Sequence, residues 1–131
     1  MTAYTPAPLP PDESQRLQTL ASYALLDTAP ELAFDDFPHL ASRLLVVPIA
    51  LISLVDEHRQ WFKSKVGLDA CETPRDWAFC SHAILQPDVM VVEDAAQDPR
   101  FAGNPLVVGE PHIRFYAGCP LVTSDGQALG T

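Results

Sequence analysis

A thiol and an imidazole lie two residues apart in an apolar stretch of this sequence. Cys80 and His82 belong to the run from Trp77 to Leu85. A thiol beside an imidazole can become a thiolate nucleophile, so the pair could form a covalent catalytic site. In a helix, however, residues two apart point roughly 200° away from each other around the axis. We therefore expect Cys80 to pack inside the fold. His82 either hydrogen-bonds a backbone carbonyl or faces a ligand, and both alternatives stay open.

Two arginines are suited to hold an anionic ligand. Arg100 lies in a long irregular stretch and Arg114 on the strand expected after it. Their guanidinium groups match carboxylate or phosphate in a two-pronged geometry. Tyr116 shares the strand face of Arg114, opposite the more apolar set, which makes it a candidate pocket residue. The alternative is that each arginine pairs with a nearby acid, namely Asp94, Asp98 or Glu110.

The cysteine pattern gives no support for a metal centre. Cys71, Cys80 and Cys119 are an odd number, contain no C-x-x-C motif and are too scattered for a structural zinc site. We expect free thiols. No glycine-rich run joins a strand to a helix, so a phosphate-binding loop is absent from the pattern as well. The sequence therefore assigns no cofactor and no metal.

Composition indicates a single soluble domain. The chain has 131 residues, of which 47% are hydrophobic and 19% charged, a normal globular balance. A net charge of −9 opposes binding to nucleic acid. The longest uncharged run, Leu44–Val55, is about half the length of a membrane span. The first residues lack the features of a secretory signal. We therefore expect a cytoplasmic protein without membrane insertion.

Two helices are expected to follow a proline-rich start. Residues 1–11 carry Pro6, Pro8, Pro10 and Pro11 and predict a flexible tail, which leaves 12–131 as one domain. Asp12 can cap a helix over residues 13–24, with an apolar stripe of Leu17, Leu20, Ala21 and Ala24. A second helix is expected from Asp35, with Pro38 in its first turn. Its predicted buried side consists of Phe37, Leu40, Ala41, Leu44 and Leu45.

The remainder of the chain predicts strands and one short helix. Residues 49–55 form an apolar run typical of a central strand, and the alternating residues 59–66 complete a hairpin with it. A short helix, capped by Asp76, is expected around 77–85 and a strand at 89–92. Residues 94–112 read as a long loop, and 113–122 as one long strand that ends in an Asp125–Gly126 hairpin turn. Hairpin-joined strands pair antiparallel, which predicts an α+β domain.

Many short runs in this order resemble one signalling family. They are Arg16-Leu17, Leu25 to Thr28, Pro30-Glu31, Phe34-Asp35, Pro48 to Asp56, Arg59 to Ser64, Gly67-Leu68, Glu72 to Arg75, Ala78 to Cys80, His82 to Leu85, Asp98 to Phe101, Asn104 to Val107 and Arg114 to Gly118. The pattern resembles the GAF domains found at the N-termini of bacterial sensor histidine kinases and diguanylate cyclases. The resemblance covers the chain from about residue 13 to its end.

That resemblance implies a fold and a function. The implied fold is a central antiparallel sheet of about six strands, with N-terminal helices on one face and a pocket of loops and a short helix on the other. The last strand stops after four residues, so we expect the domain to be incomplete at its C-terminus. The implied function is a non-enzymatic sensory module that binds a small ligand or a partner domain and biases a C-terminal output domain, and we expect it to form a homodimer.

Two other functions remain open. One is a free methionine-(R)-sulfoxide reductase, an enzyme that also uses a GAF fold and works through cysteines. The other is a dimerisation element with an empty pocket. Signatures of cyclic-nucleotide and bilin binding are not found, so the ligand is not identified. The residues expected to bind it are His82, Arg114, Tyr116, Arg100, Phe101 and Phe79.

Overall fold

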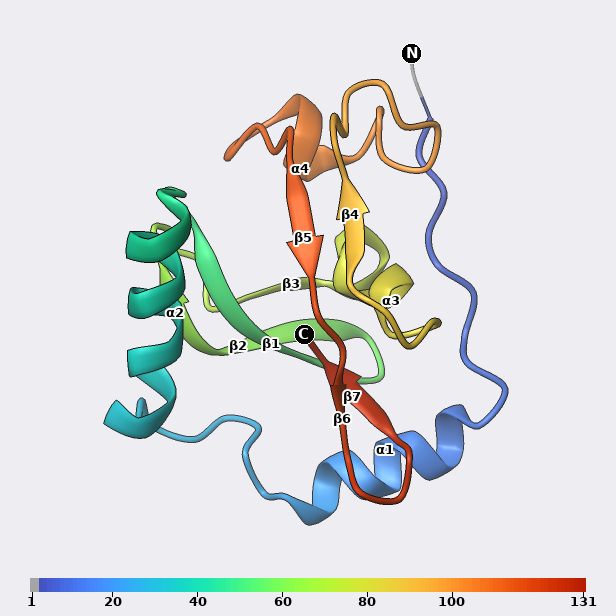
Figure 1. The fold of residues 1–131 in the computed structure, drawn as a ribbon. Coiled ribbons are helices and arrows are strands. Elements are labelled where there is room, and N and C mark those ends of the chain that lie inside the picture. The colour runs from blue at the N-terminus through green and yellow to red at the C-terminus, as the bar shows by residue number, and fades with distance from the viewer. Residues whose placement is uncertain (1–2) are drawn as a thin grey trace.

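An antiparallel five-stranded sheet forms the centre of the protein in the computed structural model, which describes residues 3–131 (Figure 1). The strand order is β3-β2-β1-β7-β6. These strands are β1 Ala50–Val55, β2 Arg59–Val66, β3 Glu72–Pro74, β6 Leu121–Val122 and β7 Ala128–Gly130. A separate two-stranded sheet pairs β4, Met90–Val92, with β5, Tyr116–Gly118. The expected α+β class and antiparallel sheet are confirmed, and the strands are divided between these two sheets.

The β1–β2 hairpin is the most regular part of the sheet. Its register pairs Leu54 with Trp61, and the ladder shifts by one residue between Ile52 and Ser53. The apolar C-terminal half of β1 is buried because elements cover both of its faces. The predicted central strand and its hairpin partner are therefore confirmed.

The helix α1, Glu13–Ser22, packs against β7 through a face that differs from the predicted one. Arg16 and Leu20 are buried, whereas Ala21 is exposed and Ala24 lies beyond the helix with a positive φ of 51°. The predicted stripe is confirmed for Leu20, and Leu17 is half-buried, but it was wrong for the two alanines, because a buried ion cluster orients the helix. Arg16 donates to Glu13 at 2.8 Å, and Arg75 reaches the same carboxylate at 2.5 Å. Asp12 precedes the helix without a side-chain capping bond.

The helix α2, Leu32–Leu45, also shows an unexpected face to the sheet. It starts before Asp35 and carries Pro38 within its length rather than in its first turn. Pro38 is buried against the sheet side, and Asp35 accepts a hydrogen bond from Ser64 of β2 at 2.5 Å. Because these contacts fix the rotation of the helix, four of the five predicted buried residues lie outside, and the fifth, Ala41, is half-buried. Phe37 and Leu44 are 68% and 72% exposed, and Leu40 and Leu45 are exposed as well.

Two ion pairs tie the linker between α1 and α2 to strand β2. Arg59 pairs with Asp27 at 2.8 Å, and the buried Lys63 pairs with Glu31 at 2.6 Å. Lys63 also donates to the carbonyl of Ala29 at 2.7 Å. A buried lysine needs such partners because removing its charge from water is costly. The linker is thereby held on the sheet although it contains no helix or strand.

The second half of the chain departs from the predicted elements at its prolines. The long strand expected at 113–122 is divided into β5 and β6, which belong to different sheets. Pro120 lies between them and has no backbone N–H to continue a ladder. The expected loop 94–112 includes the short helix α4, Pro105–Val108, which the Asn104 side chain caps. The hairpin turn is confirmed, with Gly126 at a φ of 89°.

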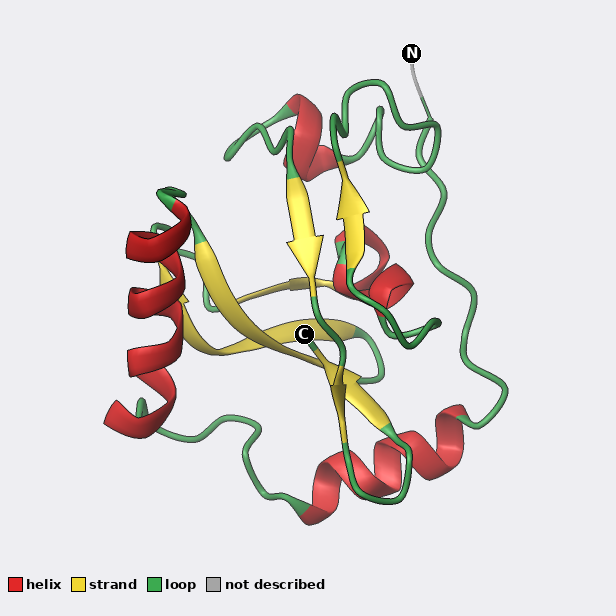
Figure 2. Ribbon diagram, viewed as in Figure 1, coloured by secondary structure: helices red, strands yellow, loops and turns green. Residues whose placement is uncertain are grey.

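The short helix expected around 77–85 is also two elements. A 3-10 turn, η1, covers Arg75–Trp77, and α3 covers Cys80–Ala83. The expected cap at Asp76 is wrong, since this residue lies inside η1. Figure 2 shows α3 beside the small sheet and away from α1 and α2. Among the described residues, no helix is long and apolar enough to span a membrane.

Candidate ligand site

An aromatic cluster brings together most of the residues that the sequence analysis selected. Phe79 precedes α3, and its ring stacks on that of Phe101 with centroids 4.0 Å apart and planes 5° apart. Tyr116 of β5 packs on Phe79 at 5.1 Å. The His82 ring meets Phe101 edge-on at 4.9 Å, and the Arg100 guanidinium lies over the same ring at 5.0 Å. We call these five residues the aromatic cluster.

The centre of the aromatic cluster is packed. Phe79 and Phe101 are 2% and 1% exposed and share a core with Met90, Val92 and Val107. Stacked rings at this distance leave no space between them, so the cluster in this form is a core with a polar rim. His82 and Arg100 form that rim. A ligand can meet the rim directly, but it reaches the rings only if the loop that carries Phe101 moves.

Arg100 is already paired with an acid. Its side chain donates to Asp98 at 2.8 Å, and the Asp98 carboxylate also accepts from the Arg100 backbone N–H at 2.9 Å. Hydrogen bonding from Arg100 lowers the pKa of Asp98, and the same contact raises the pKa of Arg100. The alternative of a nearby acidic partner is thus confirmed for this arginine. An anionic ligand at Arg100 would compete with Asp98.

His82 makes the contact with a backbone carbonyl that was one of its two expected roles. Its Nε2 lies 2.9 Å from the carbonyl oxygen of Thr5. Burial lowers the pKa of His82, while the Thr5 carbonyl acts in the opposite direction. Nε2 must carry a proton in order to donate to the Thr5 carbonyl.

Arg114 lies outside the aromatic cluster. Its guanidinium donates to the carbonyl oxygens of Val107 at 3.0 Å and Ile113 at 2.9 Å, so it supports the loop after α4.

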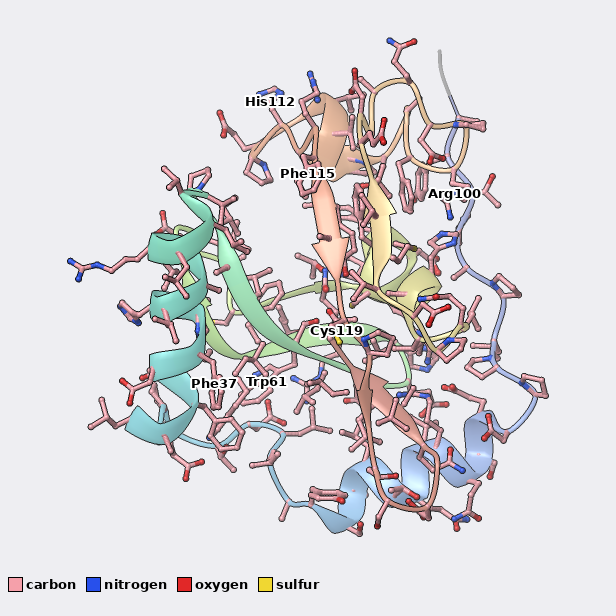
Figure 3. The ribbon with its side chains drawn as sticks, viewed as in Figure 1. Phe37, Trp61, Arg100, His112, Phe115 and Cys119 are labelled. Atoms are coloured by element: carbon pink, nitrogen blue, oxygen red, sulfur yellow. The ribbon has the colours of Figure 1, made fainter. Side chains whose placement is uncertain are left out.

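Tyr116 points inward from strand β5, and its buried hydroxyl lies 3.4 Å from Oγ1 of Thr131. Burial raises the pKa of Tyr116. Figure 3 labels Phe115 and Cys119, which belong to the more apolar set of the sequence pattern and are exposed.

Cys80 and His82 point to different surroundings, as their spacing predicted. The Cys80 thiol is buried and donates to Oε1 of Gln60 at 2.9 Å. Burial raises the pKa of this thiol to about 11, which disfavours the thiolate that nucleophilic chemistry requires. Cys71 and Cys119 are exposed and free. In the described part of the chain, no group of His, Cys, Asp or Glu could hold a metal ion.

Buried polar side chains within the five-stranded sheet were missed by the sequence analysis. Gln60 donates to Oγ1 of Thr73 at 2.7 Å, and Ser53 lies 3.1 Å from Oγ1 of Thr131. Their hydrogen bonds satisfy groups that would otherwise be costly to bury. Ser53 interrupts the apolar run of β1, and that interruption was the available signal for a polar interior.

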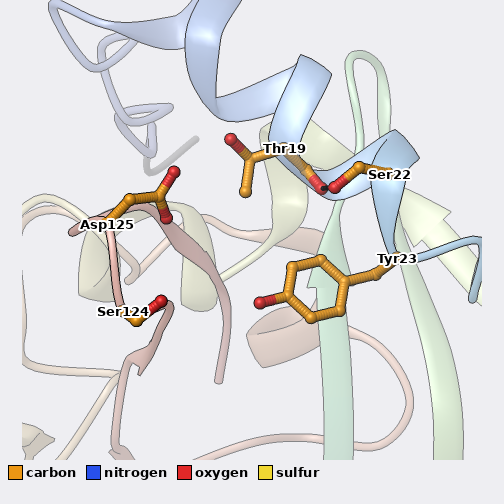
Figure 4. Close-up of a pocket in the computed structure, with 5 residues that line it drawn as sticks. All are labelled: Thr19, Ser22, Tyr23, Ser124 and Asp125. Carbon is orange, nitrogen blue, oxygen red and sulfur yellow. Dashed lines mark hydrogen bonds between the residues drawn. The ribbon is translucent and has the colours of Figure 1, made fainter.

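Two surface hollows lie apart from the aromatic cluster. One, of about 400 Å³, is lined by Thr19, Ser22, Tyr23, Ser124 and Asp125 (Figure 4). The other, of about 430 Å³, lies between the N-terminal segment and the Arg75 region. The first is open to solvent and mostly polar, whereas the second is more enclosed and lined by both apolar and charged residues. None of the six predicted ligand residues lines either hollow, whereas five of them meet in the aromatic cluster, which we therefore take as the candidate site.

Fold and sequence together define the family. The family model for the GAF domain matches residues 29–131, and the chain therefore belongs to the GAF family. The cyclic di-GMP phosphodiesterase PA2567 of Pseudomonas aeruginosa is 46% identical over 124 residues, which are 95% of this chain and 21% of that protein. The chain thus spans about a fifth of the length of this relative.

Solved structures show the same fold at low sequence identity. The GAF domain of an Acinetobacter phosphoenolpyruvate-protein phosphotransferase is 14% identical, with a TM-score of 0.57 over 89% of this chain and 72% of the other. A type II free methionine-R-sulfoxide reductase of Thermoplasma acidophilum is 17% identical, with a TM-score of 0.53 over 75% of this chain and 70% of the other.

The phosphodiesterase relative corrects one expectation. The sequence analysis predicted that the protein is not an enzyme, and it named histidine kinases and diguanylate cyclases as the setting of the domain. The relative is named as an enzyme of cyclic di-GMP hydrolysis. The prediction of no enzymatic activity is therefore wrong for the protein that this chain resembles, of which the chain spans 21%. The resemblance holds for the GAF domain itself and for its signalling role.

Proposed function

We propose that this chain is the sensory GAF domain of an enzyme that hydrolyses cyclic di-GMP. The observation that carries the proposal is the 46% identity to a cyclic di-GMP phosphodiesterase along 95% of the chain. Identity at this level along 95% of the chain supports a shared role within the parent enzyme. The domain would bias the activity of an output domain that follows it, by favouring one of two conformations.

The proposed ligand site is the aromatic cluster together with its rim. His82 and Arg100 supply hydrogen-bond donors, while Phe79, Phe101 and Tyr116 supply flat apolar surface. These groups suit a small planar ligand with a polar edge. Arg114, also predicted as a ligand residue, would act by holding the loop after α4 through its two carbonyl contacts.

A domain exchange tests the proposed function. The matched stretch of the Pseudomonas phosphodiesterase is replaced by this chain, and cyclic di-GMP hydrolysis is compared among the parent enzyme, the chimaera and a variant that lacks the stretch. We expect the chimaera to hydrolyse cyclic di-GMP at a rate close to the parent, and the deletion to change the rate at least about fivefold, the lower end of typical coupling. A deletion variant with the parental rate would overturn the regulatory role.

The ligand site is tested on the chain itself. The melting temperature is recorded with a panel of metabolites and nucleotides for the wild type and for His82→Ala. We expect at least one compound to raise the melting temperature of the wild type and to have a smaller effect on the variant, because binding to the folded state stabilises it. A flat response of the wild type to the whole panel would contradict the site.

Two expectations from the sequence remain predictions. One is a homodimer, which is tested by measuring the solution mass of the protein with and without residues 13–24. The other is a cytoplasmic location, which fits an enzyme of intracellular second-messenger turnover and is tested by cell fractionation of the full-length parent.

A further inference from the structure

The N-terminal segment 3–9, which we call the strap, lies against the rim of the aromatic cluster. The Thr5 N–H donates to the carbonyl of Arg100 at 3.0 Å, and the Gly103 N–H donates to the carbonyl of Ala3 at 3.2 Å. The Nε2 of His82 reaches the carbonyl of Thr5 at 2.9 Å. Figure 1 shows the segment running from the loop after β4, past α3, to α1. Figure 3 shows Arg100 beside it.

The strap is held by few contacts. Ala3, Thr5, Pro6, Pro8 and Leu9 are exposed, so the segment buries little apolar surface. Its prolines keep it extended and cannot donate backbone hydrogen bonds, which leaves the bonds around Thr5 as the main attachment. A segment of this kind is already extended before it docks and loses little conformational freedom on docking. Such attachment suits repeated release and return.

The strap contacts both residues that flank the Phe101 ring. His82 meets this ring from α3, and Arg100 covers it from the loop. The strap hydrogen-bonds the His82 side chain and the backbone of the Arg100–Gly103 loop, so it joins the two sides across the rim. Release of the strap would therefore remove the hydrogen bonds that join the two sides of the Phe101 ring.

We propose that the strap is a releasable cover of the ligand site, an inference that rests on the site proposed above. Once released, the rim presents the Arg100 carbonyl as an acceptor and the Gly103 amide and His82 Nε2 as donors. A peptide backbone satisfies this set when the strap is docked. The ligand that competes with the strap is accordingly one with a peptide-like amide.

The strap itself serves as the probe in the test. A variant without residues 2–9 is titrated with a synthetic peptide of residues 1–10, and NMR follows the His82 ring and the Gly103 amide. We expect the deletion to shift both signals and to speed exchange of the Gly103 amide about tenfold or more, as local opening does. Saturating peptide should restore both signals. A peptide with Thr5→Pro lacks the N–H that Arg100 accepts and should bind at least about tenfold more weakly.

Substitutions in the full-length chain provide a control in case the deletion variant does not fold. Thr5→Pro in the intact chain should reproduce the shifts of the deletion, and Pro8→Ala, at an exposed position, should leave them unchanged. The proposal of a releasable cover would be overturned if the Gly103 amide exchanged at an unchanged rate in both the deletion variant and Thr5→Pro. Equal binding of the two peptides would also overturn it. These readouts do not involve cyclic di-GMP, so failure of the strap is distinguishable from failure of the regulatory role.

Discussion

The sequence pattern predicts a buried face for α2 and an open ligand site at the aromatic cluster, and the structure shows the reverse. α2 shows an apolar stripe with helical period, yet Phe37, Leu40 and Leu44 are exposed. The stretch around His82 carries the polar groups of a binding site, yet Phe79 and Phe101 within the cluster are almost wholly buried. The difference teaches that periodicity indicates which residues share a face. Specific polar contacts decide which face turns inward, as the Asp35–Ser64 bond does for α2.

The largest expected effect separates two phenylalanines. Phe101→Ala removes a ring that is 1% exposed and stacked on Phe79, and should lower the free energy of unfolding by about 3–5 kcal/mol. Phe37→Ala removes a ring that is 68% exposed and should change it by no more than about 0.5 kcal/mol. Urea unfolding followed by circular dichroism measures both. Similar losses of unfolding free energy in the two variants would contradict the difference in burial between the two rings.

The helix α1 offers the opposite case to α2, since it buries charge. Glu13→Gln leaves Arg16 and Arg75 without their shared carboxylate and should lower the free energy of unfolding by about 3 kcal/mol, the scale for breaking a buried ion pair. The measurement is the same urea titration at neutral pH. An exposed control, Glu57→Gln, should have an effect within about 0.5 kcal/mol.

The same carboxylate predicts a pH dependence. Burial alone would raise the pKa of Glu13, but the hydrogen bonds from Arg16 and Arg75 outweigh it and lower the pKa to about 2. Because the folded pKa is below the ordinary glutamate value of 4.5, its contribution is present above that value and is lost as pH falls toward 2. Urea midpoints recorded between pH 5 and about 2 should fall less steeply in Glu13→Gln. Parallel profiles would show that this residue is not responsible.

The smallest expected effect concerns the thiols and leaves stability untouched. Cys71 and Cys119 are exposed, whereas Cys80 is buried with a raised pKa. A water-soluble thiol reagent should modify the first two at least about a hundredfold faster than Cys80 in the folded protein, because the thiolate is the reactive form. Peptide mapping by mass spectrometry gives the three rates. Rapid labelling of Cys80 would contradict its burial and would make this thiol a candidate nucleophile again.

The sequence predicted local structure better than it predicted burial. The β1–β2 hairpin and the Asp125–Gly126 turn were predictable because strand alternation and turn chemistry act over a few residues. The faces of α1 and α2 were not, because Arg16 and Asp35 bond to Ala128 and Ser64, partners far along the chain. The break between β5 and β6 at Pro120 was available in the sequence as a residue that cannot continue a ladder.

The candidate site shows the same division. The composition of the aromatic cluster was predictable from residue types, but its closure was not, because the ring of Phe101 reaches Phe79 through the fold of a long loop. The contact of His82 with Thr5 joins residues far apart in the sequence. No local pattern could indicate that contact.

The most direct test of the central claim compares the two regions inside the chimaeric phosphodiesterase. His82→Ala at the rim of the aromatic cluster and Phe37→Ala on α2 are each introduced, and the rate of cyclic di-GMP hydrolysis is measured with folding verified by circular dichroism. We predict that the His82 variant changes the rate at least about fivefold, while the Phe37 variant stays within about 1.5-fold of the chimaera. An unchanged rate in the His82 variant, or a larger change in the Phe37 variant, would contradict the aromatic cluster as the sensory site.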